Sequence, residues 1–269
     1  MSKPAHSAAL SDRISLTLKH TDAFLLHLSR HLSTTAGLEA TLATTLFTLT
    51  LLHAAALQIP ARLRSPSSRT GAIFRTALLN LARTSDDVLM FLRLFGTLEI
   101  YTWARHRWIQ PPHDPIIKLL AWLQIASAGT FQVIENLAFL AKHRILPGQQ
   151  WEHRVPGLIA LGSKFWFVRQ GLEVLRLLRV RQLRWNEDFG AERNIAAASD
   201  RDAVVSIESK ELKKKWRREV WSNLAWLPVR LYASYEDRPE ERPVSDFAFG
   251  VCGVVPSWVM LRDAWKESA

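Results

Sequence analysis

The stretch from Leu42 to Ile59 (LATTLFTLTLLHAAALQI) contains no charged residue. A helix that crosses the hydrocarbon core of a bilayer needs about 20 mostly apolar residues, so this stretch approaches the length of a span. Its threonines are compatible with a span because each hydroxyl can bond back to the helix. Arg62 and Arg64 would then lie at the lipid headgroups. The same stretch also fits a buried helix of a soluble bundle, and both environments require a helix.

A second uncharged stretch, Phe247 to Leu261 (FAFGVCGVVPSWVML), lies near the C-terminus. It is short for a span. Its small residues Gly250 and Gly253 allow another helix to approach closely, and it contains a proline, which is commoner in membrane helices than in soluble ones. Trp258 and Trp265 are suited to anchor its end at an interface. We expect a spanning or re-entrant helix here, with a soluble C-terminal helix as the alternative.

A third apolar stretch, Ile116 to Leu140, is long enough to span but contains Lys118, Gln124, Gln132 and Glu135. These side chains are costly in hydrocarbon unless they face other helices. We therefore interpret this stretch as an interfacial or bundle helix.

Apolar residues recur at helical spacing along the rest of the chain, and no alternating strand pattern or fixed-period repeat stands out. Asp114 and Pro115 form a helix start, and Pro147-Gly148 forms a stop. The sequence predicts an all-α, membrane-associated bundle with amphipathic helices and one or two membrane-spanning helices. The expected helices cover residues 12–32, 36–59, 69–108, 115–145, 156–185, 204–235 and 244–266.

This pattern divides the chain into four parts. Residues 1–68 carry the N-terminal helices, including the candidate span 42–59, and residues 69–185 carry amphipathic and bundle helices. Residues 186–202 lose the apolar periodicity and are expected to be a linker. Residues 203–269 form a C-terminal helical pair with the candidate membrane helix 247–261. The long region from residue 69 to 108 fits two helices joined near Thr84-Ser85.

The segment Arg69 to Arg83 (RTGAIFRTALLNLAR) is the most clearly amphipathic. At 100° per residue its apolar residues gather on one side, and its arginines lie on the other. This arrangement suits a helix lying in the headgroup plane, where each arginine contributes about 1 kcal/mol of attraction to anionic lipid. Insertion of such a helix wedges one leaflet and favours curvature. A surface helix of a soluble bundle shows the same pattern. The expected membrane-inserting face comprises Ile73, Phe74, Ala77, Leu78 and Leu81, and the expected headgroup contacts are Arg69, Arg75 and Arg83.

The net positive charge of the chain indicates an anionic partner. The chain has 35 Lys+Arg against 25 Asp+Glu, a net charge of +10, together with 48% hydrophobic residues and 11 Trp. A folded, basic, aromatic-rich chain of this kind fits nucleic acid or a membrane. The run Lys213 to Arg218 (KKKWRR) resembles a nucleic-acid patch, but it adjoins an apolar stripe with Trp216 and Trp221. Since the basic residues lie beside apolar stripes, we expect an anionic phospholipid membrane as the partner and no nucleic acid.

No catalytic or cofactor-binding motif is present, so we expect no enzyme, cofactor or metal site. Cys252 is the sole cysteine, which excludes an intramolecular disulfide and a cysteine-based zinc site. His27 and His31 lie four residues apart, a spacing that suits a metal, but solvated histidines are the favoured interpretation. Glu135-Asn136 is interpreted as a polar contact between helices and not as a catalytic carboxylate.

Several segments together resemble the peroxisomal biogenesis factor eleven family, most closely its divergent fungal branch. The order, the spacing and the nearly full-length cover carry the resemblance, which is weak up to Ser68 and not diagnostic in the linker. The matching segments are Asn80–Glu99 (NLARTSDDVLMFLRLFGTLE), Val133–Leu146 (VIENLAFLAKHRIL), Lys164–Leu183 (KFWFVRQGLEVLRLLRVRQL), Asn223–Tyr232 (NLAWLPVRLY) and Ser245–Trp265 (SDFAFGVCGVVPSWVMLRDAW).

The resemblance implies a peroxisomal membrane protein that elongates the membrane and promotes peroxisome division and proliferation. It further implies a homo-oligomer that works with a fission adaptor and a dynamin-related GTPase, and it assigns leaflet insertion to Arg69–Arg83. No catalytic residue is carried over. Two alternatives stay open. One is a peroxisomal channel for small metabolites, with Gln124, Gln132 and Glu135 lining a water path. The other is a soluble, basic, helical nucleic-acid-binding protein.

Overall fold

The computed structural model describes residues 4–58, 69–192 and 202–268, and side chains within 19–58, 71–184 and 211–268. Every regular element in these ranges is a helix, and they contain no strand. The expected all-α class is therefore confirmed. The α-helices are α1 (Pro4–Ser33), α2 (Thr35–Gln58), α3 (Arg69–Leu92), α4 (Gly96–Ile109), α5 (Pro115–Lys142), α6 (Gln150–Glu192), α7 (Asp202–Ala233) and α8 (Asp246–Glu267), with 3₁₀ turns η1 (Arg93–Phe95) and η3 (Pro239–Glu241).

Local sequence signals explain several helix ends. The Asp114 carboxylate accepts a hydrogen bond from the Ile117 backbone N–H at 2.9 Å, so it caps α5 as expected. Ser245 caps α8 in the same way through the Ala248 N–H. In the connection between α5 and α6, Gly148 adopts a φ of 106°, a conformation that favours glycine.

Several boundaries differ from the sequence-based expectation: α1 begins at Pro4 and not at residue 12, and α5 ends at Lys142 and not at residue 145. The break between α3 and α4 lies at Arg93–Phe95 and not at Thr84-Ser85, where the Ser85 hydroxyl donates within its own helix to the Leu81 carbonyl. Helix α6 begins before Pro156 and continues to Glu192, so the first residues expected in the linker are helical.

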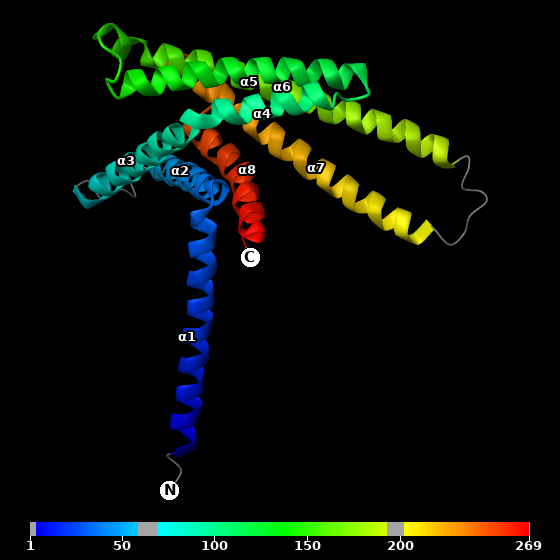
Figure 1. Cartoon of the computed structure of the whole chain (residues 1–269). Helices are drawn as coiled ribbons and strands as arrows, with labels where there is room; N and C mark the ends of the chain where they lie inside the picture. Colours follow the sequence, from blue (N-terminus) through cyan, green and yellow to red (C-terminus); the bar gives the residue numbers. More distant parts are fainter. Residues whose placement is uncertain (1–3, 59–68, 193–201, 269) are drawn as a thin grey trace.

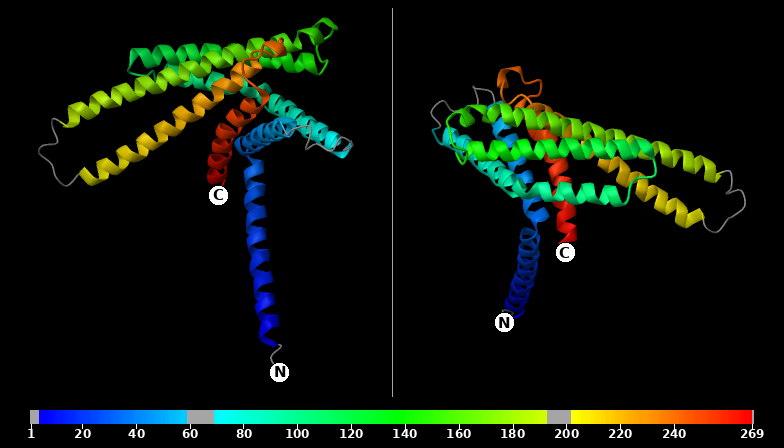
Figure 2. Two further views of the ribbon diagram at one scale, coloured as in Figure 1. Left: turned by 180° about the vertical axis from the view of Figure 1, so that it is seen from behind. Right: turned by 45° about the horizontal axis from the view of Figure 1, so that its top comes forward.

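The helices form a layer with a crosswise pair beneath it. Helices α5 and α6 lie side by side as an antiparallel hairpin, with α4 along them (Figure 1). Helices α2 and α8 pack against each other; α8 runs crosswise to this hairpin in both orientations, and α2 does so in the right-hand view (Figure 2). Helix α7 slants from the hairpin toward the side on which α8 ends. Helix α1 projects away from the rest of the molecule.

Small residues of α8 bring its backbone close to α2. A Cβ atom at Gly250 would lie 2.8 Å from the Cα of Leu51, and one at Gly253 would collide with the Phe47 ring. The Thr44 hydroxyl donates to the carbonyl of Ser257 at 3.0 Å. The close helix approach expected from the two glycines is therefore confirmed.

The end of α8 meets the junction of α1 and α2. The His27 imidazole donates to the Trp265 carbonyl at 2.9 Å, and its ring centroid lies 3.9 Å from that of the Trp265 indole. His31 is 1% exposed and hydrogen-bonds to the Thr41 hydroxyl. The interpretation of solvated histidines is therefore wrong for His31, because burial against Trp265 uses its ring as packing surface.

We predict that Gly250→Ala destabilises the chain by about 1–3 kcal/mol, because the new methyl group must displace the Leu51 backbone. Thermal unfolding of the purified chain in detergent micelles measures the effect. The matched control is Gly171→Ala in α6, where a Cβ meets open space and helix propensity should add about 1 kcal/mol of stability. Equal stability of both variants would contradict the close α2–α8 contact.

Candidate membrane-contacting surface

The apolar face expected on α3 is left largely uncovered by the fold. Ile73 and Phe74 are 62% and 61% exposed, and Ala77 and Leu81 are also exposed, while Leu78 is half-buried. Helix α3 packs inward through a different set of side chains, among them Ala82, Ser85, Leu89 and Met90. Because the fold does not bury this face, it is available to lipid.

The expected headgroup arginines have different surroundings. Arg75 is half-buried on the side turned to α2, where its carbonyl accepts a hydrogen bond from His53. Arg83 is exposed and lines a cavity of about 470 Å³ that is bounded by α2, α3, α5, α6, α7 and α8. Arg69 begins α3, but its side chain lies outside the described residues. Of the two described side chains, that of Arg83 is freer to reach a headgroup.

The exposed apolar surface continues beyond the segment that sequence reasoning singled out. From Val88 through η1 into α4, Phe91, Phe95, Leu98 and Tyr101 are 54–71% exposed. These residues follow Leu81 at intervals of three, four or seven, so the same helical period that marked 73–81 extends to residue 101. Sequence reasoning missed this continuation because it ended the amphipathic segment at Arg83, next to the helix break that it expected near Thr84-Ser85.

Three helices are long and apolar enough to cross a membrane by length and composition: α2, α5 and α8. In the most apolar stretch of α2 and of α8, 22% of the residues are buried, against 44% in α5. Helices buried in a soluble bundle would be covered far more completely, so α2 and α8 favour lipid contact. These features are consistent with a membrane protein.

Of the polar residues expected on α5, Gln124, Gln132 and Glu135 face neighbouring segments, whereas Lys118 is exposed. The Gln124 amide donates to Glu173 at 2.9 Å, and the Gln132 amide donates to the Arg93 carbonyl at 2.7 Å. Glu135 forms a 2.9 Å ion pair with Arg93, which confirms its interpretation as a polar contact between helices. The cost of placing these groups in an apolar environment is therefore offset within the bundle.

Arginine–tryptophan stacking holds α6 and α7 together. The Arg230 guanidinium lies 4.6 Å from the Trp166 ring centroid and 5.2 Å from that of Trp226. The Arg169 guanidinium stacks on two rings. It lies 4.7 Å from the Trp166 ring centroid and 5.8 Å from that of Trp103. Burial lowers the pKa of Arg230 to about 9, so the group stays charged at neutral pH and keeps its attraction to the rings.

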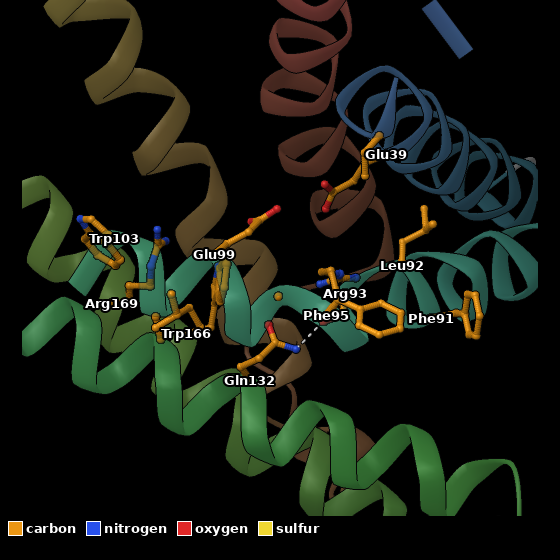
Figure 3. A pocket seen from close by; sticks show the side chains of 14 residues that line it. Glu39, Phe91, Leu92, Arg93, Phe95, Glu99, Trp103, Gln132, Trp166 and Arg169 are labelled. Carbon is orange, nitrogen blue, oxygen red and sulfur yellow. Dashed lines mark hydrogen bonds between the residues drawn. The ribbon is translucent and has the colours of Figure 1, made fainter. Parts of the chain in front are cut away.

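A cavity of about 680 Å³ lies beside this stack, between η1, α4, α5 and α6 (Figure 3). Figure 3 shows Arg169 between Trp103 and Trp166, with Gln132 bonded to the chain near Arg93. The Gln132 side chain is thus occupied by a structural contact, as are Gln124 and Glu135. This gives the metabolite-channel alternative no specific support.

The ionisable groups near these cavities form a compact network. Burial raises the pKa of the Asp86 carboxyl, against the opposing effect of Arg93 and Lys142. Lys142 itself pairs with Asp87 at 2.5 Å.

Over the described residues, no group of three or more His, Cys, Asp or Glu side chains is arranged to hold a metal ion.

Comparison with known proteins adds no relative: no family model, curated protein or solved structure matches the chain.

We predict that Glu135→Ala destabilises the chain by about 3–5 kcal/mol, because it leaves the Arg93 charge uncompensated inside the bundle. Unfolding in detergent micelles measures the loss. The double variant Arg93→Met with Glu135→Leu should lose less stability than the sum of the losses in Arg93→Met alone and in Glu135→Leu alone. In the double variant neither member of the ion pair is left without its partner. Simple additivity of the two losses would contradict the coupling.

Proposed function

We propose that this chain is a peroxisomal membrane protein that remodels and elongates the membrane and thereby promotes peroxisome division and proliferation. The mechanism is insertion of the apolar face of α3 into one leaflet, together with self-association. The resemblance of five chain segments to the peroxisomal biogenesis factor eleven family supports the choice of organelle. A fission adaptor and a dynamin-related GTPase are the partners that this resemblance implies.

The observation that carries the proposal is the exposure of Ile73, Phe74 and Leu81 on α3. A soluble bundle helix of this composition would turn these side chains inward. Here the opposite side of α3 packs on α2, which is itself apolar enough to cross a bilayer. A helix fixed along such a neighbour is held at the membrane with its free apolar face toward the lipid. Inserted side chains expand one leaflet more than the other, which favours curvature.

We predict that the full chain carrying Phe74→Glu and Leu81→Glu loses the ability to tubulate anionic liposomes, because two carboxylates oppose burial in the leaflet. Both side chains are exposed, so the fold should survive. Electron microscopy of the reconstituted chain measures tubulation. The charge-matched control is Thr76→Glu with Asn80→Glu, two exposed positions on the polar side of α3, and it should tubulate normally. Tubulation by the apolar-face variant at the control level would defeat the assignment.

We predict that a fluorescent fusion of the chain co-localises with a peroxisomal matrix marker and that its overproduction elongates the labelled organelles. Carbonate extraction of the same cells should leave the chain in the membrane fraction. Release into the soluble fraction would instead favour the basic nucleic-acid-binding alternative. A membrane-bound chain on another organelle would contradict the peroxisomal assignment alone.

A further inference from the structure

A dense set of basic side chains lies on α7 without acidic partners among the described side chains. Lys213, Lys214, Lys215 and Arg217 are all exposed. No ion pair among the described side chains uses any of them, whereas the neighbouring Arg218 pairs with Asp263. Four adjacent positive charges that repel one another are stabilised by an anionic ligand.

Tertiary contacts bring further basic residues of α6 to the same place. The Trp216 indole N–H donates to the Leu177 carbonyl at 2.9 Å, and the Arg181 guanidinium stacks 4.7 Å from the Trp216 ring centroid. One helical turn further along α6 lies the exposed Arg184. The basic surface, defined here as Arg181, Arg184, Lys213, Lys214, Lys215 and Arg217, is thus assembled from two helices.

The ion pair between Arg218 and Asp263, at 3.2 Å, places the basic surface beside the C-terminal end of α8. Helix α8 is uncharged from Phe247 to Leu261, and its charges begin again at Arg262. In both views α7 slants toward the side on which α8 ends (Figures 1 and 2). The basic surface therefore lies where the apolar part of α8 ends, which is the headgroup layer of any bilayer that α8 crosses.

The sequence of α7 changes from basic to uncharged next to this surface. Residues 220–229 contain no charge, and the basic run comes directly before them with only Glu219 between. Trp221, 68% exposed, lies on the same helical face as Lys214 and Arg217, since the three are spaced by three and four residues. An exposed tryptophan beside lysine and arginine at the end of an apolar segment is typical of a membrane interface.

We propose that the basic surface is a binding site for anionic phospholipid headgroups in the bilayer that α8 crosses. The ligands are headgroup phosphates and carboxylates, contacted by the lysines and Arg217, with Trp221 placed among the upper acyl chains. This inference rests on the membrane association proposed above, with α8 crossing the bilayer, but not on remodelling. Each basic residue near such a surface strengthens the attraction about fivefold.

The test uses the full chain in lipid nanodiscs, which leave both membrane faces accessible. Lysines are reductively methylated with formaldehyde and dimethylamine-borane, two small neutral reagents of which the borane supplies the hydride, and the rate at each site is read by peptide mass spectrometry. Discs of phosphatidylcholine are compared with discs that also contain phosphatidylserine, at low and at high salt. Methylation of Lys213, Lys214 and Lys215 should slow several-fold in the anionic discs, and high salt should restore it because exposed charges are screened.

Two comparisons make the result decisive. The α3 variant with Phe74→Glu and Leu81→Glu should keep the same lysine protection, so a failure of remodelling is separable from a failure of this site. A short DNA duplex added to phosphatidylcholine discs tests the competing ligand. Equal methylation in neutral and anionic discs, or protection by DNA without protection by phosphatidylserine, would overturn the proposal.

A variant provides a second readout. Replacing the three lysines by glutamine should lower the fraction of phosphatidylserine that copurifies with the chain from mixed vesicles. The control, Lys118→Gln with Lys164→Gln, removes exposed lysines from α5 and α6 and should retain the phosphatidylserine. Equal copurification of phosphatidylserine with both variants would count against the site.

Discussion

Three polar side chains of α5 hold the break between α3 and α4, and the placement of the membrane-contacting surface depends on them. The Gln132 and Asn136 amides donate to the carbonyls of Arg93 and Leu94, at 2.7 and 3.0 Å, and Glu135 pairs with the Arg93 guanidinium. A break in a helix leaves carbonyls without partners, and these would be costly inside the bundle. Because α5 supplies the partners, the break is fixed at η1. The inward side of α3 is fixed with it, and its apolar side is left outward.

The excess of arginine and tryptophan serves two separate purposes. Arg169 and Arg230 stack on tryptophans inside the bundle, where they join α6 to α4 and α7. The lysines of α7 and Arg217 are exposed without acidic partners among the described side chains. The second group is available to an anionic surface, whereas the stacked pair is not. The composition alone counts the two groups together, so it overstates the charge that a partner meets and hides where that charge lies.

Helical periodicity in the sequence predicted most of the fold. The Asp114 cap, the close approach through Gly250 and Gly253, and the inter-helix role of Glu135 were all predictable from local patterns, because the sequence signal for each lies within one or two helical turns. Three features were not. The α3–α4 break depends on carbonyl partners from α5. The burial of His31 depends on Trp265, far away in the chain. The continuation of the exposed stripe to Tyr101 depends on what the fold leaves uncovered.

The sequence by itself determined that the chain is helical, that α2 and α8 are apolar enough for a bilayer, and that α3 has an apolar and a basic side. These follow from the 3.6-residue period and from the free energy of transferring side chains out of water. Only the tertiary structure decided which apolar surfaces stay uncovered and which charges stay unpaired. Burial and ion pairing are properties of contacts between distant segments, as when Asp263 engages Arg218 and leaves the adjacent Arg217 and lysines free of acidic partners among the described side chains.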